Sequence, residues 1–472
     1  MIEQQLYLDG RWQDGLGAPV EVDDKWTGEV IGRYAVAAPE QVTAAIAAAE
    51  AAMDVPWPAH ERAATLRRAA AAVAECSEDL AQLLRREAGK PITAARGEVA
   101  RCVQTLSLSA AEASRITGES LDMSVVPGGE NVTAYTVSRG VGVVGAITPF
   151  NFPLNLVAHK IGPALAAGCA VVLKPSERTP LAAGALVRIL HDAGTPAGRL
   201  NLVTGDPAEV VGRLTADDRV EVLTFTGSAQ VGWDLKARSP RKRHVLELGS
   251  NTAALVMDDA DLDLVVSSVI SAGFAFSGQA CVSLQRLYVH ETLVEALLQR
   301  LASATEALGV GDPASEDVTV GPLISSAALE RVEQWVDEAV TAGARLVSGG
   351  RREGQALQPT ILADVPDTAR VVCEEVFGPV VSVISVPDVD AGIRSINDSR
   401  FGLNAAVFTR DLGTAMRCTR EIEAGSVLVN LPPAFRTDNM PYGGVKDSGQ
   451  GREGVAYAVA ELQEERLVLI AG

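Results

Sequence analysis

The sequence lacks the features that identify several common classes of protein. The chain of 472 residues has five histidines, and none stands at a spacing typical of metal ligands, so we expect no metal site. No uninterrupted apolar run reaches the roughly 18 residues that a membrane span needs. The first ten residues contain neither a basic segment nor an apolar one, so no signal peptide is predicted.

Cysteine and positive charge are also scarce. The six cysteines form no C-x-x-C motif and no obvious pairing pattern, which favours a reducing compartment, and we expect a cytoplasmic protein. Lys and Arg number 41 against 60 Asp and Glu, which gives a net charge of −19. This balance argues against binding to nucleic acid or to an anionic membrane, and solubility is the simplest explanation of an acidic surface.

The length of the chain suggests two or three domains. From 141 to 257, apolar strand-like runs alternate with helical segments, and the alternation resumes from 253 to about 440. This pattern predicts parallel sheets that are covered on both faces. The region from Pro39 to Gly89 is predicted to be helical, and a further helix is predicted over 94–116. Thr179 is expected to cap a helix that begins at Pro180.

Residues 119–139 interrupt this pattern with two alternating segments around the turn Pro127-Gly128-Gly129. Alternation on both sides of such a turn predicts a β-hairpin, which alone could be a surface flap. Near the C-terminus, residues 466–470 form an apolar strand-like run. Exposed apolar strands of this kind favour pairing with another chain.

Cys281 lies on a predicted turn at Ser277-Gly278, between an apolar helix and the strand-like run 287–289. An isolated cysteine is most often a small buried hydrophobe. Here other stretches supply possible partners for a nucleophilic thiol, and these stretches are 149–153, 247–249 and 374–379. A catalytic thiol is therefore the favoured interpretation.

Two glycine-containing stretches are candidates for a nucleotide site. Gly140, Gly142 and Gly145 match the dinucleotide fingerprint G-x-G-x-x-G, but they lie inside an apolar run, so we interpret this stretch as a strand. The sequence 225–228, Phe-Thr-Gly-Ser, stands between a predicted strand and a predicted helix, where free N–H groups can bind a pyrophosphate. Ser228 alone would be read as an ordinary helix cap.

Several of these motifs resemble the aldehyde dehydrogenase superfamily, in the family's order and over nearly the whole chain. They are Lys174-Pro-Ser-Glu177, Phe225-Thr-Gly-Ser228, Gly278-Gln-Ala-Cys281 and Pro441-Tyr-Gly-Gly-Val-Lys446. The separation of Glu247 and Cys281 is also typical of the family. The stretch 438–449 looks most like the branch that includes semialdehyde, lactaldehyde and phosphonoacetaldehyde dehydrogenases.

The resemblance implies an α/β fold with a Rossmann-like cofactor domain, a second α/β catalytic domain and a small β oligomerisation arm. The expected dinucleotide-binding domain covers 1–119 and 140–249, and the catalytic domain covers 250–446. Residues 120–139 and 447–472 form the arm and the C-terminal segment. The arm implies a homodimer or a homotetramer.

The implied reaction is oxidation of an aldehyde to the carboxylic acid with NAD(P)+. Cys281 forms the thiohemiacetal and the thioester, and the Asn151 amide with the Cys281 N–H forms the oxyanion hole. Glu247 activates the water that hydrolyses the thioester, and its position at an apolar strand end should favour its neutral form. Relatives that transfer the acyl group to coenzyme A lack this carboxylate, so release as a free acid is expected.

The resemblance also implies which residues contact the cofactor and the substrate. A carboxylate at Glu177 suits a ribose 2′-hydroxyl and repels a 2′-phosphate, so NAD is expected, with NADP possible. The expected cofactor contacts are Ile147, Thr148, Pro149, Phe150, Lys174, Ser176, Glu177, Gly205, Phe225, Gly227, Ser228, Leu248, Glu375 and Phe377. The expected substrate contacts are Phe152, Leu156, His159, Ala280, Val282 and Phe435.

Some alternatives remain open at this point. Arg101, His159 and Arg436 could bind a distal acidic group of the substrate, although an arginine is more often simply exposed. A small or semialdehyde-type aldehyde is the expected substrate class. An acyl-transferring or esterase-type thiol enzyme without a redox step, and a non-catalytic scaffold with the same fold, are the rival hypotheses.

Overall fold

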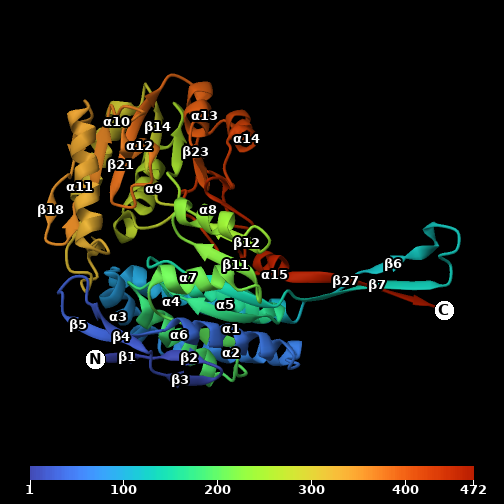
Figure 1. Cartoon of the computed structure of the whole chain (residues 1–472). Coiled ribbons are helices and arrows are strands. Elements are labelled where there is room, and N and C mark those ends of the chain that lie inside the picture. The colour runs from blue at the N-terminus through green and yellow to red at the C-terminus, as the bar shows by residue number, and fades with distance from the viewer.

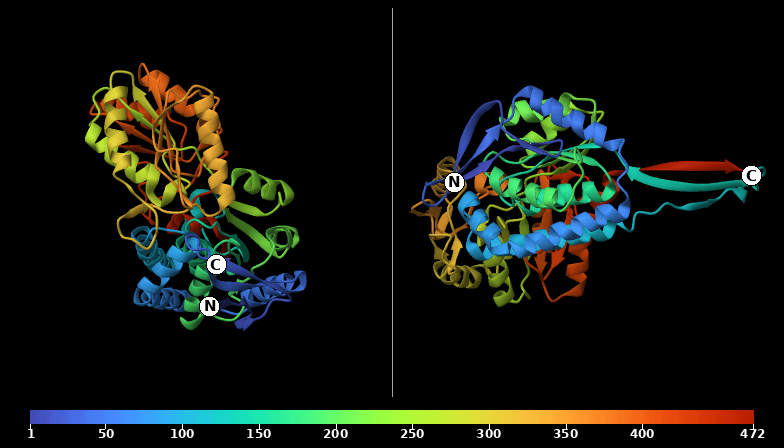
Figure 2. Two further views of the ribbon diagram at one scale, coloured as in Figure 1. Left: turned by 90° about the vertical axis from the view of Figure 1, so that its left-hand side faces the viewer. Right: turned by 90° about the horizontal axis from the view of Figure 1, so that it is seen from below.

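The computed structural model describes all residues from 1 to 472, and it contains two α/β domains and a thin arm (Figure 1). The first domain is built on an eight-stranded sheet and the second on a seven-stranded sheet. The arm projects from the first domain and contains the C-terminus (Figure 2). This architecture agrees with the α/β fold and the β arm expected from the sequence.

In the first domain, the five strands β12, β11, β8, β9 and β10 run parallel, and shorter antiparallel strands flank them. Helical crossovers between the strands make the parallel pairing possible. The strands, in their order across the sheet, are β26 (Gly449–Gln450), β12 (Arg243–Glu247), β11 (Val220–Thr226), β8 (Val143–Ile147), β9 (Ala170–Lys174), β10 (Leu200–Leu202), β2 (Leu6–Leu8) and β3 (Arg11–Gln13).

Apolar side chains fill both faces of this sheet. Along β8, Val144 and Ala146 belong to one core, whereas Val143 and Ile147 belong to another, as the alternation of a strand requires. The helices that contribute most of the first core are α2 (Ala59–Glu75), α3 (Ser77–Ala88), α4 (Ile92–Ala113), α5 (Asn155–Ala167) and α6 (Pro180–Asp192). Those that contribute to the second are α1 (Pro39–Met53), α7 (Pro207–Ala216) and α8 (Ala229–Arg238).

The second domain repeats this plan. Its strands, in sheet order, are β17 (Arg345–Ser348), β20 (Thr360–Ala363), β21 (Val380–Val386), β14 (Arg286–His290), β13 (Ala253–Val256), β23 (Asn404–Phe408) and β24 (Ser426–Val429), and all except β17 are parallel. Its helices are α9 (Leu262–Phe274), α10 (Val294–Glu306), α11 (Ser326–Thr341), α12 (Arg370–Cys373), α13 (Val389–Asn397) and α14 (Leu412–Glu421). A short 3₁₀ helix, η2 (Ala275–Gly278), follows α9 directly.

The arm is a three-stranded antiparallel sheet of β6 (Ser120–Asp122), β7 (Val132–Gly140) and β27 (Gln463–Ala471). The pairing of β27 with β7 is continuous from one end to the other. Before β27, the helix α15 (Val455–Glu461) packs on α5 and α4 of the first domain. The predicted hairpin and C-terminal strand are therefore present as one sheet, with η1 (Met123–Val125) within the turn.

The smaller strands lie outside the two main sheets. They are β1 (Ile2–Gln4), β4 (Gly17–Asp23), β5 (Val30–Val36), β15 (Gly309–Val310), β16 (Val318–Val320), β18 (Arg352–Glu353), β19 (Ala356–Leu357), β22 (Phe401–Gly402) and β25 (Val445–Lys446). No helix combines the length and the apolar character needed to cross a membrane.

Two local predictions differ from the structure. The region 39–89 is three helices, because the chain breaks at 54–58 and again at Cys76, although Gly89 does end the last of them with φ 69°. Thr179 precedes α6, but its side chain makes no capping bond. The buried carboxylate of Glu87 caps α6 instead, accepting hydrogen bonds from the N–H groups of Leu181 and Ala182.

Candidate active site

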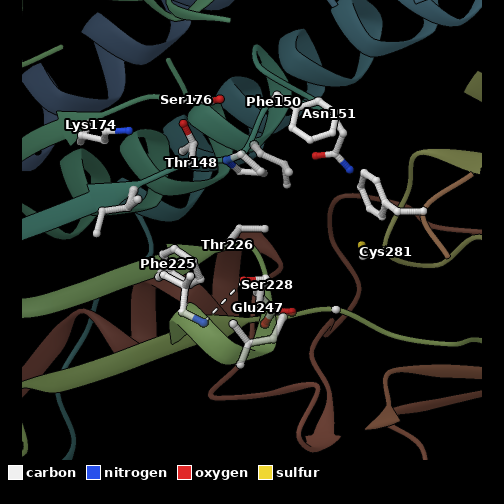
Figure 3. Close-up of a pocket in the computed structure, with 18 of the residues that line it drawn as sticks. Thr148, Phe150, Asn151, Lys174, Ser176, Phe225, Thr226, Ser228, Glu247 and Cys281 are labelled. Carbon is white, nitrogen blue, oxygen red and sulfur yellow. Dashed lines mark hydrogen bonds between the residues drawn. The ribbon is translucent and has the colours of Figure 1, made fainter. Parts of the chain in front are cut away.

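Most of the site residues predicted from the sequence line one cavity of about 370 Å³ (Figure 3). Side chains from both domains line it. The selected residues in its lining are Ile147, Thr148, Pro149, Phe150, Asn151, Leu156, Lys174, Ser176, Glu177, Phe225, Gly227, Ser228, Glu247, Leu248, Cys281, Glu375 and Phe377. The carboxyl ends of β8, β9, β11 and β12 all meet here, where open parallel sheets bind ligands.

Other selected residues are not part of the lining, namely Gly205, Phe152, His159, Ala280, Val282 and Phe435. Phe152 packs edge-on to Phe276 and lies against the Lys90 ammonium. Val282 packs beside Tyr442, and Phe435 is 45% exposed. The lining also contains Arg436, which was one of three candidates for binding an acidic group. The lining also contains residues that were not predicted as site residues, namely Pro207, Val211, Thr226, Val231, Gly249, Tyr442 and Glu453.

A strained turn presents Cys281 to the cavity. Phe276 and Ser277, with φ of 50° and 58°, both adopt the left-handed region that non-glycine residues avoid. Gly278 follows with φ 70°, and a Cβ there would lie 2.2 Å from the carbonyl oxygen of Gly378. Ser277 Oγ donates to the carbonyl of Gly321 at 2.8 Å, which helps to hold the turn. The expected break at Ser277-Gly278 is therefore present, and only glycine fits at 278.

Asn151 lies between β8 and α5 and is tied to the segment that carries Cys281. Its Nδ2 donates to the carbonyl of Gln279 at 3.0 Å, and the side chain is buried. Because an amide nitrogen has two hydrogens, one N–H of Asn151 is not used by this bond. In Figure 3, Asn151 and Cys281 lie at the same end of the cavity, opposite Lys174.

The sulfur of Cys281 lies 2.8 Å from the hydroxyl of Tyr442. Burial raises the pKa of the Cys281 thiol to about 11, although the hydrogen bond with Tyr442 and the charge of Arg436 act in the opposite direction. The thiol therefore needs help to ionise near neutral pH.

Glu247 ends β12, and both of its carboxylate oxygens are buried without a hydrogen-bond partner. Burial raises the pKa of Glu247 well above its ordinary value, and the negative charge of Glu453 raises it further. The upward shift that the apolar strand end suggests is therefore present. A buried carboxyl of this kind can hold and release a proton close to neutral pH.

Two cationic side chains contact Glu453, which lies beside Glu247 in the cavity. Glu453 accepts hydrogen bonds from Lys160 Nζ at 3.1 Å and from Arg436 at 3.2 Å. Although burial opposes them, the charges of Lys160 and Arg436 lower the pKa of Glu453 to about 2. The two neighbouring carboxyls thus differ in charge, because Glu453 stays ionised while Glu247 favours its protonated form.

Arg436 lines the cavity with only 8% of its side chain exposed. Its guanidinium stacks on the ring of Tyr442, 3.6 Å from the centroid. The Nε atom is buried and has no hydrogen-bond partner. A buried N–H of an arginine is costly to leave unpaired, which suggests that a bound molecule supplies its acceptor.

The other two residues considered for binding an acidic group do not line the cavity. Arg101 and His159 both bond to Asp438, at 2.6 Å and 2.9 Å. Although burial opposes them, these two hydrogen bonds lower the pKa of Asp438 below its ordinary value. Arg101 and His159 therefore form a separate cluster in which each already has an acidic partner.

The opposite end of the cavity fits a dinucleotide. Ser228 caps α8, and a Cβ at Gly227 would lie 2.5 Å from the ring of Phe225, so a side chain there would displace this ring beside the helix N-terminus. The hydroxyls of Thr148 and Thr226 are buried there without partners. These unpaired hydroxyls and the open helix N-terminus match the polar groups of a nucleotide.

This end of the cavity also contains the charged side chains that the family resemblance places near the two riboses. Lys174 Nζ donates to Glu177 at 3.3 Å. Glu375 accepts from the N–H of Ser250 at 2.9 Å, and burial raises the pKa of Glu375 to about 7. A Cβ at Gly249 would lie 2.4 Å from Glu375 Oε2, so a side chain there would displace this carboxylate. The rings of Phe377 and Phe150 meet edge to face at 5.7 Å.

Comparisons with known proteins point to one family. The aldehyde dehydrogenase family model matches residues 12–468. The chain is 44% identical to 3-sulfolactaldehyde dehydrogenase of Priestia megaterium, over 98% of this chain and 97% of the relative. It is 39% identical to glutarate-semialdehyde dehydrogenase of Pseudomonas putida, over 100% of this chain and 98% of the relative.

Solved structures point to the same family. An aldehyde dehydrogenase of Physcomitrella patens in complex with the product succinate superposes with a TM-score of 0.96 at 39% identity, covering 99% of this chain and 98% of that one. An NADP-dependent enzyme of E. coli superposes with a TM-score of 0.96 at 37% identity, covering 100% and 98%. The chain therefore belongs to the aldehyde dehydrogenase family, whose members oxidise aldehydes to carboxylic acids with NAD or NADP.

Proposed function

We propose that this enzyme oxidises a semialdehyde-type substrate, an aldehyde with a second, acidic group, through Cys281, Asn151 and Glu247. The observation that carries the proposal is the convergence of these three side chains on one cavity, where both oxygens of Glu247 lack a partner. Relatives named for sulfolactaldehyde, glutarate semialdehyde and succinate semialdehyde support the substrate class.

The reaction begins with the sulfur of Cys281. Its thiolate attacks the aldehyde carbon, a C–S bond forms, and the carbonyl π electrons move to the oxygen. The free N–H of the Asn151 amide and the backbone N–H of Cys281 donate to this oxyanion. The hydrogen bond from Asn151 to Gln279 fixes the amide beside the sulfur before the substrate arrives.

Cofactor binding fits the far end of the cavity. Thr148, Thr226 and Ser228 offer hydroxyl groups, Gly227 keeps the helix end open, and Glu375 offers a carboxylate for a ribose. When bound, NAD(P)+ accepts the hydride that leaves the thiohemiacetal carbon, and the cysteine is left as a thioester.

Glu247 then completes the reaction. In its ionised form it takes a proton from water, the water oxygen bonds to the thioester carbon, and the C–S bond breaks to return the thiolate and release the acid. Glu453 keeps Lys160 and Arg436 paired to itself, so neither cation forms a hydrogen bond to Glu247 that would weaken it as a base.

Arg436 is the side chain that selects an acidic substrate. Its guanidinium stacks on the ring of Tyr442, whose hydroxyl contacts the sulfur of Cys281, and its Nε is unpaired. A carboxylate or sulfonate a short chain away from the aldehyde would accept that N–H, as a charge-assisted hydrogen bond.

A comparison of two arginine variants tests the function and the substrate class together. Purified enzyme is assayed for kcat/KM with NAD on paired aldehydes, one with a terminal acid and one neutral. Cys281→Ala should abolish oxidation of both. Arg436→Met should reduce kcat/KM for the acidic aldehyde by about 10-fold or more, and affect the neutral aldehyde less.

Arg101→Met serves as the matched control, because it removes the same charge from a residue that lies outside the lining. Full activity of Cys281→Ala would refute the catalytic assignment. Equal losses on acidic and neutral aldehydes in Arg436→Met would leave Cys281 in place and refute the substrate class.

The arm supports assembly into a homodimer or homotetramer. Leu467, Leu469 and Ile470 of β27 are each at least half exposed, on a thin sheet that projects from the domain (Figure 1). Exposed apolar side chains in such a sheet favour contact with a second copy. A cytoplasmic location is supported by the six cysteines, which are all free.

A further inference from the structure

Tyr442 is an unusual neighbour for the sulfur of Cys281. Its side chain is 2% exposed, and the sulfur, at 2.8 Å, is the partner of its hydroxyl. A buried phenol hydroxyl costs free energy unless it has a partner. The hydroxyl of Tyr442 therefore contacts the reacting atom of the site.

The structure around Tyr442 holds this side chain rigidly. Its backbone N–H donates to the carbonyl of Glu453, and the Glu453 N–H donates back to the carbonyl of Tyr442, at 2.9 and 2.7 Å. Arg436 covers one face of the ring, and Val282 and Leu403 pack against it. With this support the hydroxyl stays directed at the sulfur.

Once the sulfur is ionised, the phenol is the donor in this hydrogen bond, because a thiolate has no proton to donate. Burial raises the pKa of Tyr442 well above its ordinary value, and the neighbouring Cys281 raises it further, so the ring keeps its proton. A neutral thiol is a weak acceptor, whereas a thiolate is a strong one. The bond from Tyr442 therefore favours the ionised form of the sulfur.

We propose that Tyr442 is a positioning residue, whose O–H orients Cys281 and stabilises its thiolate before attack. The inference rests on the nucleophilic role proposed for Cys281. Once the C–S bond has formed, the sulfur is neutral and accepts only weakly, so Tyr442 acts on the thiolate before attack and not on the thioester.

The other charges that face the sulfur act in known directions. Arg436 favours the thiolate, whereas Glu375 and Glu247 disfavour it. Removing the Tyr442 hydroxyl leaves these three charges in place. The effect of the hydroxyl is thus separable from theirs by a change of one oxygen atom.

The test is the pH dependence of alkylation of Cys281 by iodoacetamide, in wild type and in Tyr442→Phe. Modification of each cysteine is followed by peptide mass spectrometry in the full-length enzyme. In Tyr442→Phe we expect the midpoint for Cys281 to rise by about one pH unit, so that alkylation below the midpoint is about 10-fold slower. The plateau at high pH should be kept, because the unbonded thiolate is no weaker a nucleophile.

Two controls accompany the measurement. Cys373 is exposed, so its peptide reports the reagent and should show the same profile in both proteins. Tyr288→Phe also removes a buried phenol, one that donates to Ser395 instead of to the sulfur. It should leave the Cys281 midpoint unchanged.

An unshifted midpoint in Tyr442→Phe would overturn the proposal. So would a lowered plateau with the same midpoint, since that pattern indicates loss of structure around the sulfur. The measurement does not depend on turnover, whereas failure of the proposed function would appear as turnover in Cys281→Ala. The two failures are therefore distinguishable.

Discussion

Replacing Glu247 by glutamine should stop the enzyme at the thioester. Neither carboxylate oxygen makes a hydrogen bond in the structure, so an amide of the same size removes no existing contact. Lys160 and Arg436 remain paired to Glu453. Attack by Cys281 and hydride transfer should therefore proceed, while hydrolysis loses its base. Loss of a general base typically slows a step by about 10²–10⁴, or about 3–5 kcal/mol.

Rapid mixing of the variant with NAD and an aldehyde measures both phases. The absorbance of the reduced cofactor should rise in a burst equal to the concentration of active sites. Steady-state turnover should then be slower than in wild type by about 10²–10⁴. Mass spectrometry of the quenched enzyme should find the acyl group on Cys281. Wild-type steady-state turnover in Glu247→Gln would refute the reasoning, and so would a missing burst with no acyl group bound.

The same variant tests the environment of Glu247 through stability. Its folded-state pKa is raised from 4.5, so between 4.5 and that raised pKa the folded protein binds a proton that the unfolded chain has lost. Wild-type stability should therefore fall as pH rises through this window and level off above it. Glutamine has no proton to lose. Thermal unfolding should show the stability of Glu247→Gln relative to wild type increasing with pH across the window.

Four further predictions follow from the contacts. Asn151→Ala should lower kcat by about 10²–10³ without changing the Kd of the cofactor, measured by fluorescence titration. Glu177→Ser should raise kcat/KM with NADP relative to NAD, because a carboxylate that repels a 2′-phosphate is removed; an unchanged ratio would contradict the assignment. Burial raises the pKa of Glu87 from 4.5 to about 8, so wild-type stability should fall by on the order of 5 kcal/mol as pH rises between these two values. In denaturant titrations of Glu87→Gln this fall should be absent. Truncation after Leu462 deletes β27 and should yield monomers in light scattering, whereas an unchanged mass would exclude the arm from the interface.

Strand ends and turns were the most predictable part of the site. The turn before Cys281 is signalled by Ser277-Gly278, and the end of β11 is signalled by Thr226-Gly227-Ser228. Glycine carries this information because a close backbone approach or a left-handed φ excludes other residues. The alternation of apolar strands and helices likewise predicts a parallel sheet, and the carboxyl edge of that sheet brings the motifs together.

Hydrogen-bond partners that are far apart in the sequence could not be predicted in the same way. Thr179 and Pro180 predict the start of α6, but the cap comes from Glu87, far away in sequence, because the folded chain buries that carboxylate against the helix end. Tyr442 was recognised only as part of a motif, since nothing local to it indicates that its hydroxyl meets the sulfur of Cys281. Contacts of this kind depend on how segments that are far apart in the sequence pack together in the folded chain.

The buried polar atoms without partners explain why this cavity must bind polar ligands. Thr148, Thr226, Glu247 and Arg436 all line it, and each has such an atom. An unsatisfied buried group costs about 1–3 kcal/mol, and more if it is charged, so a fold under selection for stability alone would have paired or replaced these side chains. Their concentration in one cavity, beside a turn strained at Phe276, indicates that bound molecules supply the missing partners. The free energy lost in the unliganded enzyme is then available for binding cofactor, substrate and water.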